Sequence, residues 1–293
     1  MPVADQKILP TPLLDAPLIR AISGHYIIIS PTLLMRSLES GIYRTLRRKN
    51  PGCFHDQFGP IFEKYVSRCL TDAGLKFVNE EQLKAQLPGT AKCVDFLVTE
   101  DDCQILIDAK GTEMSGRGRV SQRADLVLRA VKSSAVKAIE QGLATSRRIR
   151  SLSSTNALAH GRDEMFLLIV TFDDLFLGSN SDFEAIFGKH LLPGLEREYG
   201  SPLPIPVEHI FFITIDELER LLARVHAKSA KIGGILRYAR TQDASNRTRK
   251  FKFQQHLDSF TTQEGRLSML EKGLEDICQR CVSRALRKSE GEN

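Results

Sequence analysis

The sequence predicts an α/β fold in which a mixed β-sheet is flanked by helices. Four short runs rich in Val, Ile, Leu and Phe have the length of β-strands, at 94–98, 105–107, 165–172 and 209–215. Longer segments with apolar residues at helical spacing lie between and around them. With 293 residues, 42% of them hydrophobic, the chain can form one large domain or a core with accessory parts.

The remaining elements follow from local signals along the chain. Segment 25–30 predicts a short strand. A helix is expected from Ser30-Pro31 to Lys49, because proline suits a first turn and the terminal basic residues suit the negative end of the helix dipole. Segment 232–246 contains glycine and serine and predicts a partly disordered connection. Further helices are expected at 54–73, 126–148, 182–199, from 216 onward, and at 262–287.

The segment CVDFLVTEDDCQILIDAKG predicts a β-hairpin that carries three charged residues. Asp95 is expected inside the first strand, and Asp108 and Lys110 end the second. Residues two apart in a strand share a face, so Asp108 and Lys110 point the same way, and antiparallel pairing can bring Asp95 beside them. Such a cluster is costly unless something binds there, and Mg²⁺ prefers oxygen ligands. A solvated strand edge or a simple salt bridge is the alternative.

A third carboxylate, Glu63, lies on the helix predicted before the hairpin. Phe58, Phe62, Tyr65 and Cys69 recur at helical spacing and predict its buried face, and Glu63 lies beside that face. Helix followed by hairpin suggests that Glu63 points at the same metal site. The alternative is a boundary glutamate paired with a lysine.

This pattern resembles the PD-(D/E)XK nuclease superfamily, the restriction-endonuclease-like fold, over Phe54 to about Phe172. Members often carry a motif like Gly-x-x-Phe-Glu-x-Tyr-Val on the first helix, and this chain reads Gly-Pro-Ile-Phe-Glu-Lys-Tyr-Val from Gly59 to Val66. The next family positions match Asp95 and Asp108-x-Lys110. Val94 stands in place of the family's proline, and Asp108 in place of the more usual glutamate, which shortens the reach of the carboxylate.

The resemblance implies a role for each of these residues. Asp95, Asp108 and the carbonyl of Ala109 would hold Mg²⁺ or Mn²⁺, and Glu63 would support a second or transient ion. Lys110 would orient or deprotonate the attacking water, and Gln141 matches the polar residue that the family often places on the following helix. Catalytic residues would therefore be Glu63, Asp95, Asp108, Lys110 and Gln141.

Basic residues are concentrated in two parts of the chain, although the net charge is only +5. Residues 110–150 contain ten Lys and Arg against three acids, and residues 220–255 contain ten against one. Such segregation predicts a phosphate-binding surface, whereas a solvated helix face is the alternative for any single arginine. The predicted nucleic-acid contacts are Arg117 and Arg119, in a glycine-rich loop, and Arg247, Arg249, Lys250 and Lys252.

Composition points to a cytoplasmic protein. No apolar run is long enough to span a bilayer, and residues 1–12 do not have the pattern of a secretory signal. Six cysteines are too few for a disulfide framework in a chain of this size. We therefore expect no membrane partner, and the sequence leaves a homodimer or a protein partner open.

The expected organisation is an N-terminal extension at 1–50, a nuclease core at 51–225 and a basic C-terminal extension at 226–293. The expected function is metal-dependent endonucleolytic cleavage, with DNA favoured as substrate, and family analogy extends this to bacterial antiviral defence. Two alternatives stay open. One is cleavage of RNA or tRNA by the same fold, and the other is an inactive module that binds nucleic acid or protein.

Overall fold

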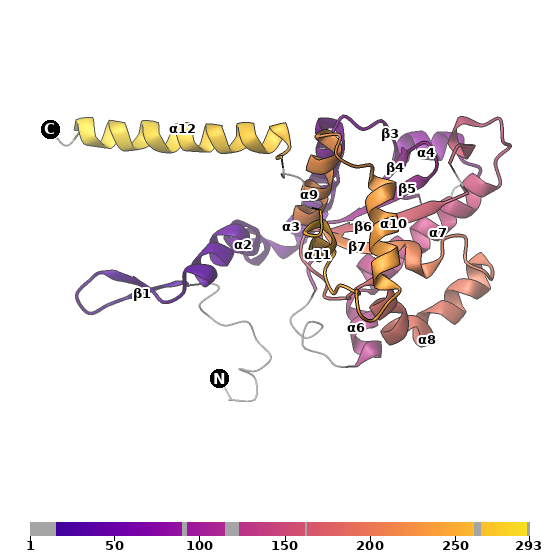
Figure 1. Ribbon diagram of the computed structural model, residues 1–293. Helices are drawn as coiled ribbons and strands as arrows, with labels where there is room; N and C mark the ends of the chain where they lie inside the picture. The colour runs from indigo at the N-terminus through magenta and orange to yellow at the C-terminus, as the bar shows by residue number, and fades with distance from the viewer. Residues whose placement is uncertain (1–15, 90–92, 115–122, 162, 261–264, 292–293) are drawn as a thin grey trace.

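The core is a five-stranded mixed β-sheet with strand order β3-β4-β5-β6-β7 (Figure 1). The computed structural model describes residues 16–89, 93–114, 123–161, 163–260 and 265–291. The strands are β3 (Phe77–Asn79), β4 (Phe96–Thr99), β5 (Gln104–Lys110), β6 (Met165–Thr171) and β7 (Ile210–Thr214). The predicted mixed sheet flanked by helices is therefore confirmed.

The pairing of the strands makes the sheet half antiparallel and half parallel. Strands β3, β4 and β5 pair antiparallel, with Phe96 opposite Ile107. Strands β5, β6 and β7 run parallel, with Lys110 opposite Thr171 and Thr171 opposite Thr214. The three carboxyl ends therefore meet at one edge of the sheet. Every residue of β6 is buried, as expected for a parallel strand that is covered on both faces.

Helices cover both faces of the sheet. One core cluster joins β5 residues Ile105 and Ile107 to helices α3, α9, α10 and α11. The other joins Leu106 to helices α6, α7 and α8. The helices on the first face are α3 (Pro51–Asp72), α9 (Ile215–His226), α10 (Ile232–Asp243) and α11 (Phe253–Leu257). Those on the second face are α6 (Ala124–Ala130), α7 (Lys137–Arg150) and α8 (Asn180–Tyr199).

Smaller elements complete the chain. A two-stranded hairpin, β1 (Leu18–Arg20) and β2 (Tyr26–Ile28), precedes helix α2 (Pro31–Lys49), and α4 (Glu80–Gln86) follows β3. Two 3₁₀ turns cover Ala157–Ala159 and Val207–His209. The long C-terminal helix α12 (Ser268–Gly291) extends away from the sheet (Figure 1). Among the described residues, no helix is long and apolar enough to cross a lipid bilayer.

Two predicted elements differ from the structure. The single helix expected at 126–148 is divided into α6 and α7 by a π-helical turn at Lys132–Val136. The partly disordered connection expected at 232–246 is wrong, because most of that segment is helix α10. Its Ile232, Ile235 and Leu236 are fully buried against the sheet.

Candidate active site

The β4–β5 hairpin brings Asp95 and Asp108 to one face of the sheet. Strand β4 begins at Phe96, so Asp95 immediately precedes the strand instead of lying inside it as predicted. The strand register, extended by one residue, brings Asp95 opposite Asp108. Asp95 shares a face of the sheet with Leu97, and Asp108 with Leu106, and both leucines pack in the cluster on the α7 side. The backbone N–H of Ala109 donates a hydrogen bond of 2.7 Å to Asp95 Oδ2, which fixes that carboxylate against β5.

Asp108 is a fully buried carboxylate with little compensation. It forms an ion pair with Lys110 Nζ. Apart from this contact with Lys110, neither of its oxygens accepts a hydrogen bond from the described part of the chain. A buried carboxylate ordinarily satisfies its oxygens, because desolvation without hydrogen bonds costs several kcal/mol. Asp108 therefore has the unmet demand for positive charge that a cation would satisfy.

Gln141 positions Lys110. The amide of Gln141, on α7, accepts a hydrogen bond of 3.1 Å from Lys110 Nζ at Oε1 and donates one of 2.8 Å from Nε2 to the carbonyl of Cys93. Gln141 is itself buried, so its orientation is determined by these two contacts. The structure thus brings together four of the predicted residues: Asp95, Asp108, Lys110 and Gln141.

The surroundings of Asp95 and Asp108 favour the protonated form of their carboxyl groups. Burial and the neighbouring Asp108 charge raise the pKa of Asp95 to about 7. Burial likewise raises the pKa of Asp108, against the opposing influence of Lys110. Two buried carboxylates side by side cannot both ionise cheaply. Clusters of this kind are enriched at functional sites, although structural ion pairs also produce them.

Glu63 lies within electrostatic range of the same carboxylates. It is half-buried on α3, and its pKa is raised by burial and then by the charge of Asp95. Its own charge also contributes to the raised pKa of Asp108. Helix α3 approaches this end of β5 closely. A Cβ on Gly111 would lie 2.9 Å from the ring of Phe58, so this glycine accommodates helix packing.

The carboxylates do not form a complete protein cage for a metal. Over the described residues, no group of three or more His, Cys, Asp and Glu side chains lies close enough to hold a metal ion. The donor set that the hairpin offers is Asp95 and Asp108. Mg²⁺ is commonly bound through one or two carboxylates and keeps several waters, so this donor set fits it. Ala109, whose carbonyl the resemblance implies as a ligand, contacts Asp95 through its N–H.

Two further features near the site were not predicted from the sequence. Lys137 begins α7 one turn before Gln141, and its charge lowers the pKa of Asp108. Arg47, at the end of α2, forms a salt bridge of 2.7 Å with Glu113, three residues after Lys110. The helical spacing between Lys137 and Gln141 was a signal available in the sequence. The contact between α2 and residue 113 had no local signal.

The residues predicted to contact nucleic acid lie in different surroundings. Arg117 and Arg119 lie outside the described residues. The other four, Arg247, Arg249, Lys250 and Lys252, are called the basic block below. Arg249 pairs with Asp182 at 3.3 Å and Lys252 with Asp174 at 3.0 Å, whereas Arg247 is exposed. Acids distant in sequence therefore neutralise part of this block.

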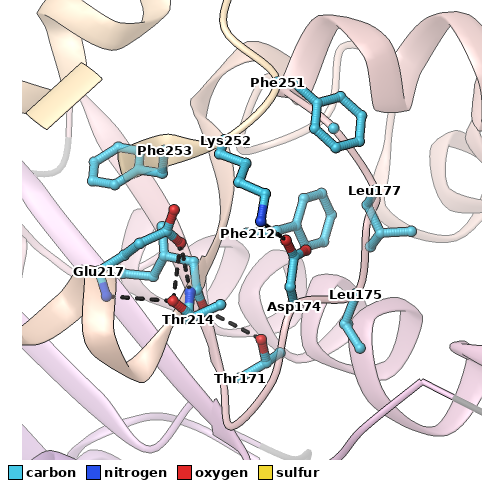
Figure 2. A pocket seen from close by; sticks show the side chains of 12 residues that line it. Thr171, Asp174, Leu175, Leu177, Phe212, Thr214, Glu217, Phe251, Lys252 and Phe253 are labelled. Carbon is cyan, nitrogen blue, oxygen red and sulfur yellow. Dashed lines mark hydrogen bonds and ion pairs between the residues drawn. The ribbon is translucent and has the colours of Figure 1, made fainter. Parts of the chain in front are cut away.

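A small pocket lies at the carboxyl ends of β6 and β7, on the edge of the sheet where β5 also ends. Figure 2 shows Lys252 directed at Asp174 there, with Phe251 and Phe253 on either side. The cavity of about 20 Å³ has room for about one water molecule. Its Glu217 accepts hydrogen bonds from the N–H groups of Thr214 and Gln254. The buried carboxylate of this pocket therefore has its hydrogen bonds within the protein. The pocket does not include Asp95 or Asp108.

Comparisons with known proteins give no relative. No family model, no curated protein and no solved structure matches this chain. Inference about its function therefore rests on the geometry described above and on the motif resemblance.

Proposed function

We propose that this chain is a Mg²⁺-dependent nuclease with a restriction-endonuclease-like core and that its substrate is DNA. The observation that carries the proposal is the convergence of Asp95, Asp108 and Lys110 on one face at the end of β5. The order of residues matches that of the PD-(D/E)XK superfamily, and the Gln141 amide supports the lysine as the resemblance implies.

Asp95 and Asp108 are the residues that would hold the ion, with Glu63 supporting it from α3. A cation held by these two carboxylates would offset their mutual repulsion and the cost of their burial, which raise the pKa of Asp95 to about 7. When bound, Mg²⁺ supplies Lewis-acid polarisation of a phosphoryl oxygen and acidifies water.

The chain's own residues contribute position and charge. A lysine ammonium has three donors, and here one contacts Gln141 and another Asp108. The third can donate to a non-bridging oxygen of a phosphodiester, where negative charge accumulates as water attacks phosphorus. Because Gln141 and Asp108 hold Nζ from two sides, Lys110 is ordered before substrate arrives. The backbone N–H of Ala109 similarly fixes Asp95.

The test is cleavage of plasmid DNA, single-stranded DNA and tRNA, each with Mg²⁺, Mn²⁺ or EDTA. We expect DNA cleavage that requires a divalent ion and is abolished by Asp108→Ala. Lys189→Ala, an exposed lysine on α8, should be silent and serves as the control. Cleavage of tRNA alone would assign the same chemistry to RNA. Binding without cleavage by the metal-loaded protein would refute the nuclease and favour a binding module.

A further inference from the structure

The N-terminal hairpin and α2 carry an unusual amount of exposed apolar surface. Eleven of the eighteen exposed large apolar side chains in the described chain lie between Leu18 and Leu46. All six residues of β1 and β2 are exposed. An isolated two-stranded hairpin is at best marginally stable in water, so this one needs a covering surface. We call residues 16–49 the arm.

Helix α2 presents part of this surface as a continuous stripe. Met35, Leu38, Ile42 and Leu46 recur at intervals of three and four residues and are 55%, 63%, 75% and 51% exposed. The opposite side of α2 is anchored to the domain, where buried Tyr43 stacks on Phe172 with 4.3 Å between ring centroids. The stripe therefore faces outward from a helix whose position is fixed.

The exposed area is the size of a protein interface. At roughly 100 Å² each, eleven such side chains present about 1,000 Å², more than the ~300–600 Å² of the largest patch on a typical monomer. A standard interface buries about 800 Å² per partner. The arm alone thus supplies the surface that a stable dimer needs.

Helix α12 packs on the domain only through its first turn, where Met269 and Leu270 lie against the core, and the described side chains that follow are uncovered. The side chains of Glu271 through Arg280 are all exposed, including Leu274 (47%) and Ile277 (58%). Leu274 and Ile277, beyond the turn that packs on the domain, lie three residues apart, which is one of the spacings of a helix-pairing seam. The part of a helix that extends beyond its packing contacts gains little stability from its propensity alone. Figure 1 shows α12 and the arm extending from the same side of the domain.

The charge of α12 identifies the kind of partner. Residues 268–279 contain three acids and one lysine, whereas residues 280–291 contain four basic residues and one acid. Two copies of this helix packed antiparallel would place each acidic half against a basic half. A two-fold axis perpendicular to the helices produces that arrangement, and the interface then presents the same patch from both subunits.

We propose that the arm and α12 form the interface with a second copy of this chain, with the two α12 helices antiparallel. The proposal does not depend on nuclease activity. It predicts a dimer of the 32.8 kDa chain in solution, which multi-angle light scattering and sedimentation equilibrium of the full-length protein measure directly.

The first test places charge in the stripe. Leu38→Glu with Ile42→Glu should weaken self-association at least about a hundredfold, because each copy buries unpaired carboxylates. Ile186→Glu, at a 52% exposed position on α8, makes the same change outside the interface and should leave the dimer intact. Circular dichroism of each variant checks the fold.

The second test determines whether α12 pairs with α12 of a second copy of this chain. Glu271→Lys with Glu275→Lys makes α12 predominantly basic, and Arg284→Glu with Arg287→Glu makes it predominantly acidic. At low salt, the dimer dissociation constant of each variant alone should be at least about tenfold higher than that of the wild type. An equimolar mixture of the two variants should form a heterodimer with wild-type affinity.

Three results would overturn the proposal. A monomeric wild type over the whole measured concentration range would do so, as would a dimer insensitive to the stripe variant. Charge variants that fail to recombine on mixing would exclude the antiparallel self-pairing. Sedimentation of a monomeric chain with anionic lipid vesicles would assign the arm to a membrane surface instead.

Discussion

Replacing Asp95 with asparagine should stabilise the protein in the absence of metal. Asparagine keeps the size of the side chain, and its amide oxygen can still accept the Ala109 N–H. It removes a buried negative charge beside Asp108, which is itself fully buried and ion-paired with Lys110. The stability lost by burying two neighbouring carboxylates should therefore be recovered, as expected if the cluster is kept for function at the expense of stability.

The pKa of Asp95 sets the magnitude and the pH window. Burial raises the pKa from 3.8 to about 7 in the folded state. Between these values the folded protein holds a proton that the unfolded chain has lost, so wild-type stability falls as pH rises and levels off above about pH 7. A shift of this size corresponds to roughly 4 kcal/mol at pH 8, which is about 10 °C in Tm for a domain of this size.

Thermal and urea unfolding in EDTA, from pH 4 to pH 8, measures this effect. The free energy of unfolding of Asp95→Asn should exceed that of the wild type most at pH 8, and the two values should converge near pH 4. Asp163→Asn removes an exposed carboxylate and should match wild type throughout. Mg²⁺ should raise the wild-type midpoint by mass action and leave Asp95→Asn nearly unchanged. An asparagine variant no more stable than wild type at pH 8 would refute the buried-charge reasoning.

Three further predictions concern activity and binding. Glu63→Gln should lower cleavage in Mg²⁺ and recover part of it in Mn²⁺, and full activity in Mg²⁺ would make Glu63 a boundary residue. Gln141→Leu should lower kcat about 10- to 100-fold with little change in KM, because the amide positions Lys110 without touching substrate, and an unchanged kcat would contradict that role. Alanine at all four positions of the basic block should weaken binding to unrelated DNA sequences equally. It should reduce the salt slope by about 2, since roughly 0.9 is lost per phosphate contact and two of the four cations are ion-paired. An unchanged slope would mean that the block does not contact phosphate.

The elements around the candidate site could be predicted from local pattern. The hairpin, the strand at 165–171 and the helix carrying Glu63 have strong apolar periodicity and recognisable ends. The positive φ of 76° at Gly74 marks the stop after α3. The register of a tight hairpin then follows from its length, so the opposition of Asp95 and Asp108 was accessible from sequence.

Long-range partners could not be predicted in this way. The parallel pairing of β5 with β6 joins residues about sixty positions apart, and the acids that neutralise Arg249 and Lys252 lie far away in the chain. A glycine such as Gly111, directly after Lys110, is compatible with close approach of a ligand, but the close approach there is to Phe58. Helix α10 was missed for a different reason. Its glycines outweighed a helical pattern, Ile232, Ile235 and Leu236, that was present in the sequence.

The most direct test of the nuclease proposal is a side-by-side cleavage assay of wild type and Lys110→Met in Mg²⁺. Methionine preserves the length of the side chain and removes the charge that Asp108 and Gln141 hold in place. Both proteins should bind DNA with similar affinity in Ca²⁺, and wild type alone should cleave it when Mg²⁺ is added. Equal cleavage by the two proteins would contradict the assignment of the active site to the β4–β5 hairpin.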